Sequence, residues 1–130
     1  MNPEAAMERL NLVLAHAWMV RNFLKHADEV QEDEEMLDVH RTIFDAIRAV
    51  EPSRERGDAR EYLRRMQGKL SKLRRAAEFF VREYRRVSPH TNFEMAALSL
   101  SGCVRQIEEI LASVPKGSAP GEQTAAPQEE

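Results

Sequence analysis

The sequence predicts an all-α protein: an antiparallel up-down-up-down four-helix bundle with a disordered C-terminal tail. Apolar residues recur at intervals of three and four along four separate stretches, which is the period of a helix that buries one side. The chain of 130 residues has only five Gly and is rich in the strong helix formers Ala, Leu, Met, Glu and Arg. The stretches are joined by short connections, which place consecutive helices antiparallel.

The first predicted helix contains an apolar pattern that runs from Leu10 to Ala27. Trp18, Met19 and Phe23 add apolar residues beside this pattern, so the middle of the helix is apolar on nearly every side. A helix with this composition is typical of a buried position, and we expect it to be the most deeply buried of the four.

The second and third predicted helices carry narrower apolar stripes. The second stripe runs from Met36 to Val50 and includes His40, while the third runs from residue 59 to residue 87 and is sustained for about four heptads. Asp58 and Glu61 form the spacing of a capping pair at the start of the third helix. At 1.5 Å per residue this helix is roughly 40 Å long.

The fourth predicted helix runs from Phe93 to Val114, with Thr91 and Glu94 as a capping box at its start. The predicted connections are then residues 28–33, 51–57 and 88–91. Residues 1–115 form the bundle. Residues 116–130 have no large apolar side chain, so they are predicted to be a disordered tail.

Charge is segregated along the chain although its net value is only −3. Residues 1–51 hold eleven acids and five bases, a net charge of −6, and residues 60–86 hold ten bases and three acids, a net charge of +7. Up-down-up-down topology places the acidic start of the second helix beside the basic end of the third. The small net charge excludes a uniformly basic nucleic-acid-binding protein.

A basic strip in the middle of the third helix has no evident acidic counterpart in the sequence, which leaves it available to a partner such as the acidic patch of a second copy. An alternative interpretation is that the strip follows a phosphate backbone. Internal charge complementarity and a solvated helix face are favoured over that alternative, because aromatic residues are not interleaved with the bases. The strip consists of Arg64, Arg65, Lys69, Lys72, Arg74 and Arg75.

Metal or ligand binding in the bundle core is a further alternative. A carboxylate-bridged diiron centre requires Glu-x-x-His on two helices, and none of the four His residues has a carboxylate three positions before it. If the core holds a metal, the candidate ligands are His16 and His40. We expect neither a metal nor a cofactor.

Two segments share the pattern of Arg, four residues and His. They are Arg21 to His26, in which Asn22 directly follows the arginine, and Arg85 to His90. The first resembles the signature of HEPN ribonucleases, which are helical bundles that cut RNA at a composite dimer site without metal. The resemblance implies that the histidine acts as general base on the ribose hydroxyl and that the arginine stabilises the phosphorane charge.

The sequence also contains a lone cysteine, Cys103, and a glycine inside a predicted helix, Gly68. The lone Cys103 excludes an internal disulfide and lies among small residues, as expected of a packed thiol rather than a nucleophile. Gly68 inside a long helix is predicted to mark a close approach by another helix or a partner. The sequence shows no signal peptide and no stretch long enough to span a bilayer, so we expect a cytoplasmic protein without membrane contact.

Taken together, these patterns favour a small non-enzymatic bundle that acts through protein contacts, either as a homodimer or as an adaptor. Trp18 and Met19, which lie beyond the core stripe of the first helix, are candidate contact residues alongside the basic strip. RNA binding or cleavage through the Arg-x4-His pairs is the alternative.

Overall fold

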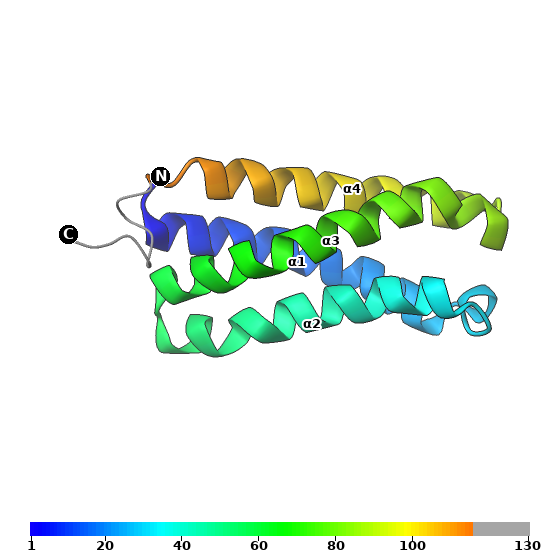
Figure 1. The fold of residues 1–130 in the computed structure, drawn as a ribbon, viewed down its shortest axis with the longest axis horizontal. Coiled ribbons are helices and arrows are strands. Elements are labelled where there is room, and N and C mark those ends of the chain that lie inside the picture. The colour runs from blue at the N-terminus through cyan, green and yellow to red at the C-terminus, as the bar shows by residue number, and fades with distance from the viewer. Residues whose placement is uncertain (116–130) are drawn as a thin grey trace.

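The computed structural model describes residues 1–115, and these form a bundle of four long helices with one short 3-10 turn. The helices lie side by side along the long axis of the molecule and alternate in direction, so the predicted fold class is confirmed (Figure 1). The predicted tail at 116–130 lies outside the described residues. The elements are α1 (Pro3–His26), η1 (Asp28–Val30), α2 (Glu34–Arg56), α3 (Ala59–Val87) and α4 (Thr91–Ala112).

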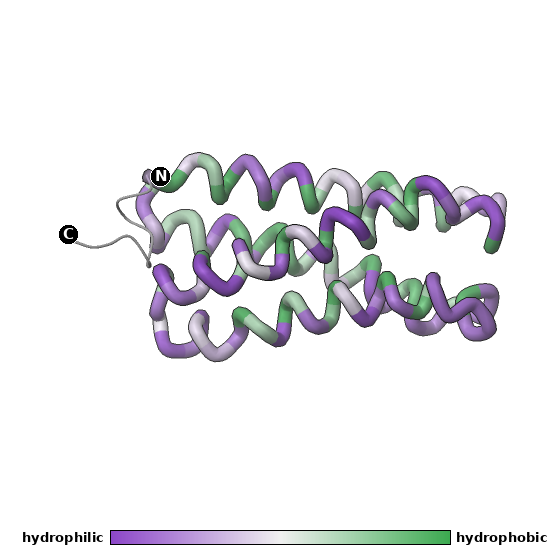
Figure 2. Tube along the Cα trace, in the orientation of Figure 1, coloured by the Kyte–Doolittle hydropathy of each residue, from purple (hydrophilic) through white to green (hydrophobic). Residues whose placement is uncertain are grey.

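The four helices close into a ring around one core. Each helix packs against the helix that follows it in the chain, α4 packs against α1, and α1 also contacts α3 across the bundle. Hydrophobic and hydrophilic residues alternate along each helix, as expected for helices that bury one side (Figure 2). The largest side chains with less than 2% exposure are Tyr62, Phe80, Leu10, Leu24, Met36, Ile43, Met66, Leu100 and Ile107.

The helix α2 continues one and a half turns further than predicted. It passes through Pro52 and ends at Arg56, so the predicted connection at 51–57 is wrong and shrinks to Gly57 and Asp58. Pro52 cannot donate a backbone hydrogen bond, but it lies on the exposed side, where water can hydrate the carbonyl group that loses its donor. Gly57 ends the helix with a left-handed backbone at φ 71°, and Asp58 N bonds Ser53 O at 2.8 Å.

The starts of α3 and α4 are capped in different ways. Asp58 caps α3, as predicted, because its Oδ1 accepts a hydrogen bond from Glu61 N at 3.1 Å. The predicted capping box of α4 is wrong. His90 takes the capping position and its Nδ1 accepts from Asn92 N at 3.0 Å, which makes Thr91 the first helical residue.

The helix α1 is central but it is not buried all round. It contacts each of the other three helices, as expected for the most deeply buried of the four, yet Leu12 and Met19 on its outer side are 65% and 63% exposed. The start of α1 lies at the same end of the bundle as the end of α4, and the Met1 amino group donates to Ser113 O at 2.9 Å (Figure 1). Within residues 1–115, no helix is long and apolar enough to cross a membrane.

Candidate interaction surfaces

Half of the predicted basic strip is already paired with acids. Arg64 and Arg65 contact Glu61 on their own helix at 2.5 and 2.8 Å, and Arg74 Nε lies 2.6 Å from Glu108 Oε2 of α4. The prediction that these three arginines lack acidic partners is therefore wrong. A carboxylate three or four residues earlier on the same helix serves Arg64 and Arg65, and a neighbouring helix supplies the partner of Arg74. The hydrogen bond from Arg64, together with Arg65, lowers the pKa of Glu61 to about 2.

The other half of the strip has no carboxylate partner among the described residues. Lys69 and Lys72 form no ion pair there, and Arg75 donates only to Ser71 Oγ, at 2.7 Å. Gly68 lies one turn before Lys72, and apart from its chain neighbours and the adjacent backbone of its own helix no described atom comes within 4 Å of the position that a Cβ would take. The predicted approach of another helix of the bundle to Gly68 is therefore wrong, and the glycine opens onto solvent.

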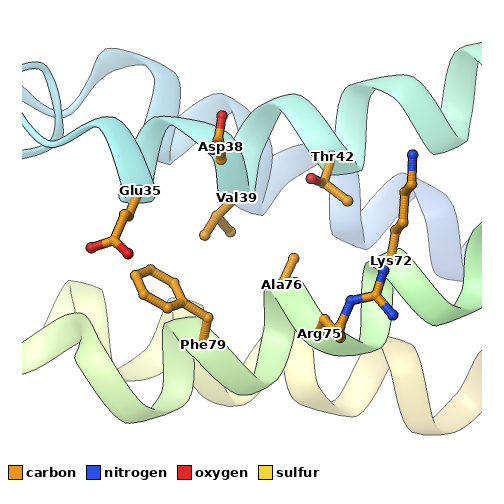
Figure 3. Close-up of a pocket in the computed structure, with 8 residues that line it drawn as sticks. All are labelled: Glu35, Asp38, Val39, Thr42, Lys72, Arg75, Ala76 and Phe79. Carbon is orange, nitrogen blue, oxygen red and sulfur yellow. The ribbon is translucent and has the colours of Figure 1, made fainter.

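A groove between α2 and α3 contains two of these unpaired cations (Figure 3). It has a volume of about 360 Å³. Glu35 lies near one end, beside Phe79, and Lys72 and Arg75 lie at the other end. We call this surface the α2/α3 groove. Its lining residues are Glu35, Asp38, Val39 and Thr42 of α2 and Lys72, Arg75, Ala76 and Phe79 of α3.

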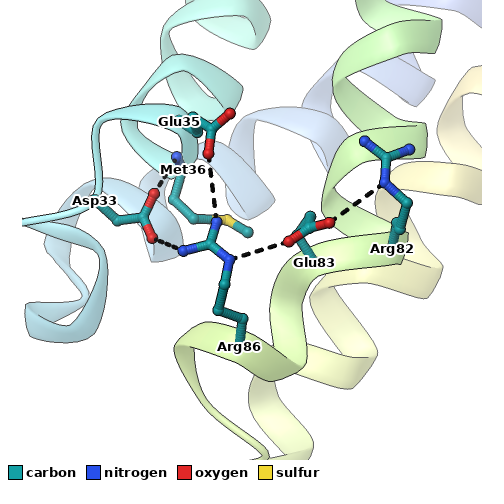
Figure 4. A network of polar contacts seen from close by, with 6 residues as sticks. All are labelled: Asp33, Glu35, Met36, Arg82, Glu83 and Arg86. Atoms are coloured by element: carbon teal, nitrogen blue, oxygen red, sulfur yellow. Dashed lines mark hydrogen bonds and ion pairs between the residues drawn. The ribbon is translucent and has the colours of Figure 1, made fainter.

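The predicted pairing of the acidic start of α2 with the basic end of α3 is confirmed at one arginine (Figure 4). Arg86 contacts Asp33, lies 3.7 Å from Glu35 and bonds Glu83 of its own helix at 3.0 Å. The hydrogen bond from Arg86 lowers the pKa of Asp33, and the backbone amide of Met36 adds to this effect. Asp33 and Arg86 are therefore engaged within the bundle, whereas Glu35 is 72% exposed and only loosely held.

An uncharged outer surface lies on the opposite side of the bundle, on the neighbouring helices α1 and α4. Residues 10–20 and 95–104 contain no Asp, Glu, Lys or Arg. We call the outward-facing part of these two segments the α1/α4 face. Exposed apolar side chains follow both of its helices: Leu12 (65%) and Met19 (63%) on α1, and Met95 (50%) and Leu98 (58%) on α4.

Trp18 does not join Met19 on this face. Its ring is half-buried against α2, with its centroid 6.0 Å from that of Phe44, and the guanidinium carbons of Arg21 and Arg48 lie 4.4 and 5.8 Å from it. Successive residues of a helix point about 100° apart, so Trp18 turns towards α2 and Met19 turns outwards. The two candidate contact residues are therefore separated.

The arginine and histidine of the first Arg-x4-His pair do not converge. Arg21 stacks on the rings of α1 and α2, whereas His26, five residues later, points about 140° away around the helix and is exposed. Asn22 is also exposed. In the second pair Arg85 lies 5.4 Å from the Tyr84 ring, and His90 uses Nδ1 to cap α4. Both pairs lie at the end of the bundle where α1 ends and α4 begins (Figure 1).

The candidate metal ligands His16 and His40 and the thiol of Cys103 differ in their exposure. Within residues 1–115, no three His, Cys, Asp or Glu side chains are grouped so that they could hold a metal ion. His16 is exposed, while burial and then the charge of Arg21 lower the pKa of the half-buried His40. Burial raises the pKa of the Cys103 thiol, whose Sγ lies 3.7 Å from the Val13 carbonyl oxygen. Such a thiol packs two helices together and is a poor nucleophile.

The α1/α4 face was the feature least visible in the sequence. Met95 and Leu98 lie off the periodic stripe of the fourth helix, and this position together with the charge-free runs in both helices could have indicated an exposed apolar face. No protein-family model, curated protein or solved structure matches this chain.

Proposed function

We propose that this protein is a non-enzymatic adaptor whose α1/α4 face binds the apolar side of a helix in another protein. The observation that carries the proposal is the set of four large apolar side chains, each at least half exposed, on two neighbouring helices whose central segments are free of charge. Depletion of charge and enrichment in Met are typical of the centre of a protein interface. Two adjacent antiparallel helices also form a shallow trough, into which a third helix packs ridge into groove.

The chemistry of the face suits an adaptable and transient contact. Met19 and Met95 have unbranched, flexible side chains that fit partners of different shape. Covering a half-exposed apolar side chain contributes roughly 1–2 kcal/mol. The stabilisation from all four is therefore only about as large as the smallest free-energy cost of bringing two proteins together. We therefore expect an affinity that depends strongly on each of these side chains. The proposed compartment is the cytoplasm, which a single unpaired thiol fits.

A site-specific cross-linking experiment tests the proposal. A photo-reactive amino acid at Met95 is compared with the same group at Gln67, an exposed residue of α3. A protein captured only from Met95 is purified, and its binding to the unmodified full chain is measured by calorimetry. We expect Leu12→Ser with Met19→Ser to weaken binding at least about tenfold, and Arg60→Ser to leave it unchanged.

Two results would overturn the adaptor proposal. One is a captured partner whose affinity is the same for the Leu12→Ser and Met19→Ser double variant and for the Arg60→Ser control. The other is capture of RNA in place of protein at Met95. Circular dichroism of each variant verifies that the bundle is folded in these comparisons.

A further inference from the structure

We infer a second interaction surface on this protein and assign the α2/α3 groove to a second copy of the same chain. The inference stands apart from the proposed adaptor function, because the α2/α3 pair lies across the four-helix ring from the α1/α4 pair. Both contacts can form at the same time. A dimer made through the groove would present two α1/α4 faces.

The groove contains both cations and carboxylates that a binding partner can reach. Lys72 and Arg75 contact no carboxylate in the described part of the chain. The side chains of Glu35 and Asp38 are each 72% exposed, and their contacts with Arg86 and Arg41 measure 3.7 and 3.3 Å. Ion pairs at such exposure contribute little to stability, so a partner can compete for these carboxylates at small cost.

The spacing of the charges specifies the occupant. Lys72 precedes Phe79 by two helical turns, about 10 Å, and Glu35 lies beside Phe79 (Figure 3). An occupant must therefore bring carboxylates to one end of the groove and cations to the other, at this same separation. A second copy has the same charges at the same separation. A two-fold axis pairs Lys72 with the partner subunit's Glu35 and, by symmetry, pairs Glu35 with the partner subunit's Lys72.

The middle of the groove suits a close contact between the two copies. Val39, Ala76 and Phe79 provide an apolar strip between the two charged ends. Gly68 extends this surface along α3, because it lies one turn before Lys72 and leaves its backbone open. An apolar centre bordered by complementary charges is the usual organisation of a specific interface.

Charge reversal followed by mixing tests the inference on the full chain. Sedimentation equilibrium of the unmodified protein at low salt should show a monomer–dimer equilibrium that weakens as salt screens the charges. We expect Lys72→Glu with Arg75→Glu, and separately Glu35→Lys with Asp38→Lys, to raise the dimer dissociation constant at least about tenfold each. An equimolar mixture of the two variants should restore a heterodimer, because opposite charges then meet again.

The controls separate this surface from the α1/α4 face. Arg60→Glu with Arg105→Glu makes the same change in net charge as Lys72→Glu with Arg75→Glu, but outside the groove, and it should leave the dimer intact. Leu12→Ser with Met19→Ser should also leave it intact. The inference is overturned by a protein that stays monomeric at about 100 µM, a concentration that populates even weak dimers. A dimer unaffected by either reversal, or a mixture that does not re-associate, also overturns it. None of these results bears on binding at the α1/α4 face.

Discussion

The guanidinium of Arg86, in the last turn of α3, binds the carboxylate of Asp33, the residue that caps the start of α2. One oxygen of this carboxylate accepts from Met36 N at 3.1 Å, and the other accepts from the arginine. The same side chain therefore begins one helix and connects it to another. Its lowered pKa follows from these two interactions.

Asp33→Ala and Asp33→Asn should separate the two roles of this side chain. The alanine variant loses both the cap and the ion pair, and we expect its free energy of unfolding to fall by about 1 kcal/mol or more. The asparagine variant keeps a capping oxygen and should lose less, because the exposed part of the pair is weak. Urea unfolding at neutral pH measures both. Equal losses in the two variants would show that the cap contributes nothing.

Glu61 should contribute to acid denaturation. Because Arg64 and Arg65 lower its pKa to about 2, the carboxylate stabilises the folded state fully above its ordinary value of 4.5. This contribution is lost as the pH falls towards about 2. Glu61→Gln should therefore reduce the urea midpoint at pH 7 and have a much smaller effect near pH 2. Glu78→Gln, on the exposed side of the same helix, is the matched control and should change neither midpoint.

Replacing Tyr62 by phenylalanine should stabilise the protein. The Tyr62 ring is fully buried, and its hydroxyl has no hydrogen-bond partner within the described part of the chain. Folding then removes the hydroxyl from water without compensation, which costs about 1–3 kcal/mol. Tyr62→Phe keeps the ring, so the free energy of unfolding should rise by about 1 kcal/mol. A lower melting temperature for this variant would show that the hydroxyl is bonded in solution.

Adjacent substitutions at Trp18 and Met19 should differ sharply in their effect. Trp18→Leu removes the contact with Phe44 and the stacking of two guanidinium groups, and we expect a loss of about 2 kcal/mol. Met19→Leu changes an exposed side chain and should stay within about 0.5 kcal/mol of the unmodified protein. Chemical denaturation followed by circular dichroism measures both. Similar losses would mean that Trp18 is not anchored against α2.

Gly68→Ala should stabilise the isolated chain. The glycine lies inside α3 with a helical backbone, and an added methyl group meets no described atom within 4 Å. Alanine is favoured over glycine in a helix interior by about 1 kcal/mol, mainly through the entropy of the unfolded chain. Thermal unfolding at low protein concentration measures this gain. A loss of stability would reveal a contact that the open surface does not show.

The sequence predicts the architecture well because every helix carries its own periodic apolar stripe. Both ends of α3 follow from local signals, since Asp58 caps its first turn and Pro89 follows its last. The errors arise where a local rule competes with a neighbouring preference. Pro52 usually marks a boundary, but Gly57 supplies a better helix end four residues after Ser53. Likewise His90 caps α4 one residue ahead of Thr91. Its ring nitrogen accepts the hydrogen bond, whereas the usual capping residues are Ser, Thr, Asp and Asn.

The candidate surfaces were predicted less completely, because they depend on the direction of each side chain. Periodicity cannot show that Trp18 turns inwards while Met19 turns outwards until the position of α2 is known. The pairing of Arg74 with Glu108 joins residues of two helices, so no spacing along the chain reveals it. The acidic start of α2 and the basic end of α3 could be matched in advance because topology alone brings them together.

The hydrogen bond between the Met1 amino group and the Ser113 carbonyl has a consequence for how the fold can be rewired. Since residues 1 and 113 adjoin, a short peptide could join them, and new chain ends could be opened at the tight turn of Gly57 and Asp58. Such a circular permutant keeps every interhelical contact while the pairing of α1 with α4 becomes local in sequence. The four helices form a closed ring, so the chain could begin and end at a different position and the helices could still pack in the same arrangement.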